Sequence, residues 1–143
     1  MRISLPAPHL FSIDSGTAWS LDEGDPKTRE QLGIYLRSLE HGAYLNVRAQ
    51  EAGNHPATQA GLLALLREQQ WASPPFDEWM LDAIGLVVVG GSFETVGMGG
   101  EIVLEVFVTD GKRIANLAGP AERQVVRDML ESVKQLASTL RFE

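Results

Sequence analysis

The most regular pattern of residue types lies between Glu101 and Thr109, where β-branched and apolar side chains predominate. This composition favours a strand, and Asp110-Gly111 follows it directly. Asp-Gly is a preferred two-residue hairpin turn with positive φ at both positions, so the sequence predicts a β-hairpin. The pairs predicted across it are Thr109 with Lys112, Phe107 with Ile114, Val106 with Ala115, and Leu104 with Leu117.

An amphipathic helix is expected after the hairpin, beginning at Gly119-Pro120 because proline suits the first helical position. Apolar residues then recur three and four positions apart, which is the helical period. They are Val126, Met129, Leu130, Val133, Leu136, Ala137 and Leu140. Because an isolated helix of this length is only marginally stable, its apolar stripe must pack on the sheet.

Alternating apolar and polar residues predict four strands in the first part of the chain. Their expected ranges are 9–14, 17–21, 31–39 and 43–50. The second strand would place Trp19 in the core, and the last two would form a hairpin around Glu40-His41-Gly42. Between Asp22 and Glu30, charged residues with Gly and Pro predict a solvated loop.

A helix is expected over residues 57–70, which are rich in Ala, Leu, Gln and Glu. Its apolar face would consist of Leu62, Leu63, Leu65, Leu66 and Trp71. Ser73-Pro74-Pro75 should end this helix. Residues 77–82 fit either a helical turn or a strand, whereas the apolar run Ile84–Val89 predicts a strand buried on both faces.

The resulting order, β-β-β-α-β-β-β-α with a fourth early strand as an option, predicts an α+β fold with a central antiparallel sheet flanked by helices. Both faces of the late hairpin carry apolar side chains, so one helix should cover each face. A chain of 143 residues suits a single domain, and the prediction is one domain over residues 1–143.

Charge and composition exclude several classes of partner and location. The net charge is −7, and the 12 Lys and Arg residues are scattered, so no nucleic-acid partner is expected.

Cysteine is absent, which excludes thiol catalysis and disulfides and fits a reducing compartment. Pro6 and Pro8 interrupt the first segment, so no secretory signal is expected. The longest apolar run is far shorter than the ~20 residues of a membrane helix. The expected location is therefore cytoplasmic, without a membrane span.

No catalytic or cofactor motif stands out. The glycines between Gly90 and Gly100 do not match a nucleotide-binding fingerprint, because a strand follows where a helix should begin; they predict turns and bulges. His9, His41 and His55 lack metal-ligand spacing, so surface or turn roles are expected. Ser92 is not in a nucleophile-elbow sequence. The prediction is no cofactor, no metal and no catalytic residue.

The residues that most strongly suggest a binding surface are aromatic. Trp71, Phe76 and Trp79 lie in one proline-broken segment, with Met80 and Met98 near in sequence. Large aromatic and flexible methionine side chains are typical of adaptable protein-binding surfaces. The alternative is that these residues cap the core under a loop. The carboxylates beside them, at Asp77, Glu78 and Asp82, fit a solvated loop better than an apolar pocket that raises a carboxyl pKa.

The layout resembles the PsbP-like and Mog-like domain family, which includes the DcrB-like bacterial proteins. The segments that carry this resemblance are residues 9–21, the hairpin ending Tyr44–Arg48, the helix to Trp71, Val88–Gly91, Glu105–Lys112, and Glu101–Leu117 with the final helix. The resemblance implies an antiparallel sheet between helices. It also implies binding to other proteins, since members serve as photosystem subunits, GTPase-release factors and effector chaperones. It implies no shared catalytic motif, and the missing signal and lipid-anchor cysteine favour the cytoplasmic, adaptor-like branch.

Three functional hypotheses follow. The leading one is a small non-catalytic protein-binding domain, an adaptor or effector chaperone, that uses the Trp71–Trp79 segment. The second is a ligand-binding or hydrolytic enzyme whose site combines distant residues, such as His41 or His55 with Asp77. The third is a structural homodimer joined through sheet edges.

Overall fold

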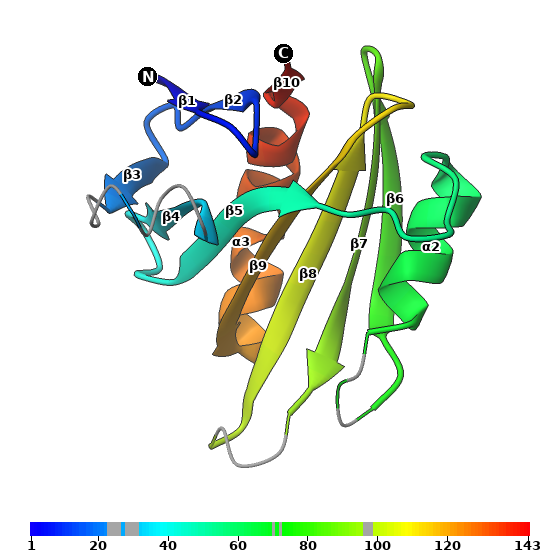
Figure 1. Cartoon of the computed structure of the whole chain (residues 1–143). Coiled ribbons are helices and arrows are strands. Elements are labelled where there is room, and N and C mark those ends of the chain that lie inside the picture. The colour runs from blue at the N-terminus through cyan, green and yellow to red at the C-terminus, as the bar shows by residue number, and fades with distance from the viewer. Residues whose placement is uncertain (23–26, 28–31, 70, 72, 96–98) are drawn as a thin grey trace.

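The protein is described by a computed structural model that covers residues 1–22, 27, 32–69, 71, 73–95 and 99–143 (Figure 1). The strands are β1 (Arg2–Leu5), β2 (Phe11–Asp14), β3 (Trp19–Asp22), β4 (Ile34–Ser38), β5 (Tyr44–Gln50), β6 (Phe76–Ala83), β7 (Leu86–Glu94), β8 (Glu101–Thr109), β9 (Ile114–Glu122) and β10 (Arg141–Phe142). The helices are α2 (Gln59–Arg67) and α3 (Arg123–Ser138).

Two antiparallel sheets form the β structure. The larger has the order β3-β4-β5-β9-β8-β7-β6, and the smaller has the order β1-β2-β10. The predicted α+β class is confirmed, but the predicted order contains too few strands. β1 was missed because two prolines follow it, and β10 because it has only two residues. Residues 77–82, ambiguous in sequence, belong to strand β6.

The β8–β9 hairpin is present, but its predicted register is wrong by two residues. Thr109 lies opposite Ile114 rather than Lys112, and Phe107, Val106 and Leu104 lie opposite Asn116, Leu117 and Gly119. The loop is longer because the Asp110 carboxylate accepts hydrogen bonds from the backbone N–H groups of Lys112 and Arg113, both at 2.9 Å. Of the two predicted turn positions, only Gly111 has positive φ. Because the register differs by two residues, an even number, every side chain remains on its predicted face of the sheet.

Helix α3 begins at Arg123, so the predicted start at Gly119-Pro120 is wrong. Strand β9 instead continues to Glu122, with Pro120 opposite Val103 of β8. The pairing of β9 with β5 ends at Ala118. The missing backbone N–H of Pro120 therefore costs no hydrogen bond to β5. The predicted apolar stripe is confirmed by five buried helix residues, Val126, Met129, Val133, Leu136 and Ala137.

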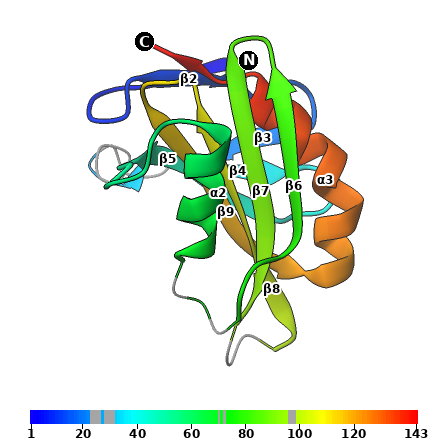
Figure 2. The same ribbon diagram turned by 90° about the vertical axis from the view of Figure 1, so that its right-hand side faces the viewer.

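The two helices lie on opposite faces of the large sheet, as predicted (Figure 2). Helix α3 and the small sheet enclose the larger core, which includes Trp19, Ile102, Leu104, Val106, Val108 and Met129. Helix α2 packs on β7 and β8 over a second cluster, Leu62, Leu65, Leu66, Val89, Phe93, Phe107 and Ile114. Strand β8 is therefore covered on both sides.

Several local predictions need correction. Gly90 and Gly91 lie inside β7 rather than in a turn, and Ile84 is fully exposed in the turn before that strand. Helix α2 is shorter than predicted, because the Thr58 hydroxyl caps it by accepting the Gly61 N–H at 3.1 Å. Trp71 lies after this helix rather than on its apolar face. Most of the predicted loop at 22–30 lies outside the described residues.

Candidate functional site

The sheet separates the aromatic residues that the sequence grouped together. Phe76 and Trp79 are partly buried and pack on the core beneath α3. The Arg123 guanidinium lies 4.5 Å from the centre of the Phe76 ring, and the Lys134 ammonium lies 5.2 Å from the Trp79 ring. A β-bulge between Phe76 and Trp79 turns both side chains to this face.

The remaining members of that predicted set lie elsewhere. Met80 is 49% exposed and lies opposite Val89, whose side chain faces α2. Trp71 is 40% exposed, and its ring centre lies 6.2 Å from that of Phe93 in the cluster under α2. Met98 lies outside the described residues. Trp71 and Met80 therefore share one side of the sheet, opposite to Phe76 and Trp79.

Trp71 lies beside a buried carboxyl group on the central strand. Its indole N–H is close enough to the side chain of Glu105 on β8 to favour the charged form of that carboxyl group. Glu105 is 5% exposed and lies between two small residues, Gly91 on β7 and Ala118 on β9.

The electrostatic setting of Glu105 is unusual for a carboxyl group in a sheet. Burial raises its pKa above the ordinary value of 4.5, while the Trp71 hydrogen bond and the positive charge of Arg48 act in the opposite direction. One oxygen, Oε2, has no hydrogen-bond partner within the described structure. Such a group is costly to bury and therefore marks a candidate functional position.

A second buried acceptor lies on the same face. Asn116 of β9 is 1% exposed, and its Oδ1 also has no hydrogen-bond partner among the described residues. Its amide nitrogen donates to the Val106 carbonyl at 3.3 Å. Arg48 of β5 lies directly opposite Asn116, and its charge acts on Glu105, so the three polar residues share one face of the sheet. Glu105 and Asn116 were not predicted from the sequence; the available signal was one acidic residue inside a strand that is otherwise apolar.

The histidines do not form a catalytic group with Asp77. His55 Nε2 lies 2.6 Å from Glu68, and His41 Nε2 lies 3.9 Å from Glu40. His9 is buried rather than superficial, and its Nδ1 accepts the Ala49 N–H at 2.9 Å. Within the described part of the chain, no group of three or more His, Asp or Glu residues could hold a metal ion.

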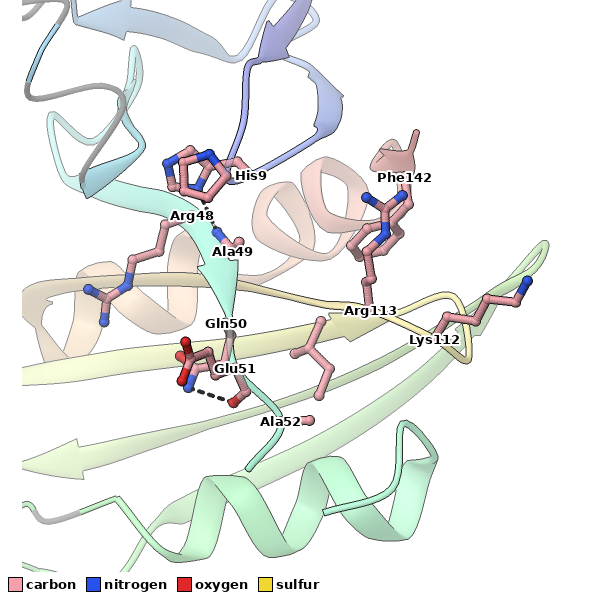
Figure 3. Close-up of a pocket in the computed structure, with 11 residues that line it drawn as sticks. His9, Arg48, Ala49, Gln50, Glu51, Ala52, Lys112, Arg113 and Phe142 are labelled. Atoms are coloured by element: carbon pink, nitrogen blue, oxygen red, sulfur yellow. Dashed lines mark hydrogen bonds between the residues drawn. The ribbon is translucent and has the colours of Figure 1, made fainter. Parts of the chain in front are cut away.

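A cleft of about 590 Å³ lies next to Arg48 (Figure 3). It opens between the turn before β2, the end of β5, the tip of the β8–β9 hairpin and β10. The residues with charge or aromatic character on its wall are His9, Arg48, Glu51, Lys112, Arg113 and Phe142. Arg113 is positioned by its stacking 5.4 Å from the Phe142 ring centre and by donation to the Glu143 carbonyl.

No family model matches the sequence, and no curated protein matches it. The fold does match solved structures, among them the solution structure of cyanobacterial PsbP (CyanoP) from Synechocystis sp. PCC 6803. That match has a TM-score of 0.60 and covers 100% of this chain and 92% of the other. The chain has a PsbP-like fold. The predicted resemblance is thus confirmed for the fold, and at 13% sequence identity the PsbP-like match carries no information about function. Among the described helices of this PsbP-like chain, none is long and apolar enough to span a membrane.

Proposed function

We propose that the protein is a small non-catalytic protein-binding domain, an adaptor or chaperone, in which Trp71 is the anchor for the partner. The observation that carries this proposal is an exposed tryptophan whose ring packs against Phe93 and whose indole N–H lies beside the buried Glu105 carboxyl group. Tryptophan is enriched at the energetic centres of protein interfaces. A side chain that is already ordered loses less entropy when it binds.

Other exposed apolar side chains lie on the same face of the sheet as Trp71. Tyr35 and Tyr44, which are 40% and 42% exposed, lie on the same face of the sheet as Glu105, according to the strand pairing. Met80 adds an exposed flexible side chain beside α2. Aromatic and methionine side chains with a few polar groups between them are the composition expected of an interface core. The residues that carry this proposal are Trp71 and Met80, rather than the partly buried Phe76 and Trp79.

The other two hypotheses have less support. The enzyme hypothesis needs His41 or His55 beside Asp77, and both imidazoles have glutamate partners instead. The homodimer hypothesis needs a pairing edge, and β6 is an edge strand of the large sheet. However, β6 carries a bulge and the exposed carboxylates Asp77, Glu78 and Asp82, which are features that discourage edge pairing. A cytoplasmic location remains part of the proposal, supported by the absence of cysteine.

The proposal is tested by capture of partners from the source cells with tagged wild-type protein and with Trp71→Ala. Ile84→Ala is the matched control, because Ile84 is a fully exposed apolar residue in the β6–β7 turn, away from Trp71. We expect a stoichiometric protein partner with wild type and Ile84→Ala, and roughly tenfold less or none with Trp71→Ala. Equal recovery by a folded Trp71→Ala protein, checked by thermal unfolding, would contradict the proposal.

A further inference from the structure

The cleft beside Arg48 is positively charged although the chain as a whole is acidic. Its wall contains three cationic side chains, Arg48, Lys112 and Arg113, and one carboxylate, Glu51. The whole chain has 19 acidic and 12 basic residues. A concentration of positive charge against this background creates a local field that selects negatively charged groups.

Arg48 and Lys112 have no ion pair among the described residues, whereas Arg67, Arg123 and Lys134 each have a glutamate partner. Arg113 donates to the Glu143 carbonyl and also interacts by charge with Asp110. Arg48 is drawn toward Glu105 by charge, but that carboxyl group lies buried on the sheet. Arg48 and Lys112 are exposed. Their charges are therefore available to a ligand.

The positions of the cations favour an extended ligand over a single small anion. Figure 3 shows Arg48 at one end of the cleft and Arg113 and Lys112 at the other, with the Arg48 and Lys112 side chains extending outward at the two rims. Apolar side chains, including Ile114, Ala52 and Phe142, line the cleft as well. A ligand complementary to these side chains needs negative charges at separate points, with apolar groups between them.

We propose that the cleft binds an acidic peptide segment of the protein partner, with carboxylates facing Arg48 at one end and Arg113 and Lys112 at the other. This inference rests on the proposed protein-binding function and specifies the chemistry of the partner. The cleft adjoins the Trp71 site through Arg48, which lines the cleft and lies opposite Asn116. One partner can therefore contact Trp71 and place an acidic segment in the cleft.

The test uses the full-length protein and a short capped peptide of alternating glutamate and leucine, labelled for fluorescence anisotropy. A lysine–leucine peptide of the same length is the ligand control. The double variant Arg48→Gln/Lys112→Gln removes two cleft charges, and Arg37→Gln/Arg127→Gln removes two exposed charges outside the cleft. Both variants change the net charge equally, so a difference between them reports the location of the charges.

We expect the acidic peptide to bind wild type and the Arg37→Gln/Arg127→Gln variant alike, and the cleft variant about tenfold more weakly. Binding should also weaken several-fold when salt is raised, because exposed charges are screened. The inference is overturned if the acidic peptide does not bind at millimolar concentration, if the lysine–leucine peptide binds equally well, or if both double variants weaken binding equally. Capture of the partner through Trp71 with no peptide binding would overturn this inference and leave the proposed function standing.

Discussion

Replacing Glu105 with glutamine is expected to make the protein more stable at neutral pH. The buried Glu105 carboxylate has one oxygen without a partner, and burying this group charged rather than neutral costs on the order of 1–3 kcal/mol. Glutamine has the same shape and also leaves one polar atom unpaired, so the expected gain comes from the loss of the charge alone. With an unfolding entropy of about 2.1 cal/mol/K per residue over 143 residues, 1 kcal/mol corresponds to about 3 °C. The expected rise in Tm is therefore roughly 3–10 °C.

The sign of the pH dependence follows from the raised pKa of Glu105. Since the folded protein binds this proton more tightly than the unfolded chain, wild-type stability is highest below the unfolded value of 4.5 and falls as pH rises through the folded pKa. The Glu105→Gln variant lacks this loss, so the two free energies of unfolding should move apart as the pH rises from about 4.5 to the folded pKa and differ by a constant amount above it.

Urea denaturation across a pH series, followed by circular dichroism, measures both quantities. Glu101→Gln is the matched control, since Glu101 lies on the same strand and the same face of the sheet but is only partly buried. A Glu105→Gln protein that is less stable at pH 7, or whose advantage over wild type does not change with pH, would refute the reasoning. The expected gain also bears on function, because a carboxylate retained at a cost to stability is typical of binding sites.

Three further substitutions test the packing. His9→Ala should destabilise the fold by about 1–3 kcal/mol, because the Ala49 N–H loses its acceptor; unchanged urea denaturation would contradict this role. Gly90→Ala should cost about 1–3 kcal/mol, since a Cβ there would lie 2.3 Å from the Trp79 ring. Gly91→Ala should cost less, because its nearest neighbour is the flexible end of Leu66 at 3.0 Å; thermal unfolding that ranks the two variants in reverse would count against this packing.

Residue periodicity predicted the faces of the elements better than their ends. The alternation in β8 and β9 assigned each side chain to the correct face, but the loop length depended on the Asp110 carboxylate binding two backbone N–H groups. The start of α3 was misplaced for a similar reason. Pro120 fits a first helical turn or a strand position that is paired on one side only, and the extent of β5 pairing decides between them.

The candidate site was harder to predict because it is formed by residues distant in sequence. Nearness along the chain suggested that Trp71, Phe76 and Trp79 share one surface, but the bulge in β6 turned two of them toward α3. The interaction between Trp71 and Glu105 joins a segment after α2 to the middle of β8. No periodic pattern reports such a contact, although an acidic residue within an apolar strand indicates that a partner is required.

The central claim is that Trp71 anchors a protein partner. Its most direct test is the affinity of the purified partner for wild type, Trp71→Ala and Ile84→Ala, measured by titration calorimetry. The account predicts that Trp71→Ala raises Kd by roughly 30-fold or more, as expected for an interface centre worth about 2 kcal/mol, and that Ile84→Ala leaves it within about twofold. Equal affinities for wild type and a folded Trp71→Ala protein would contradict it.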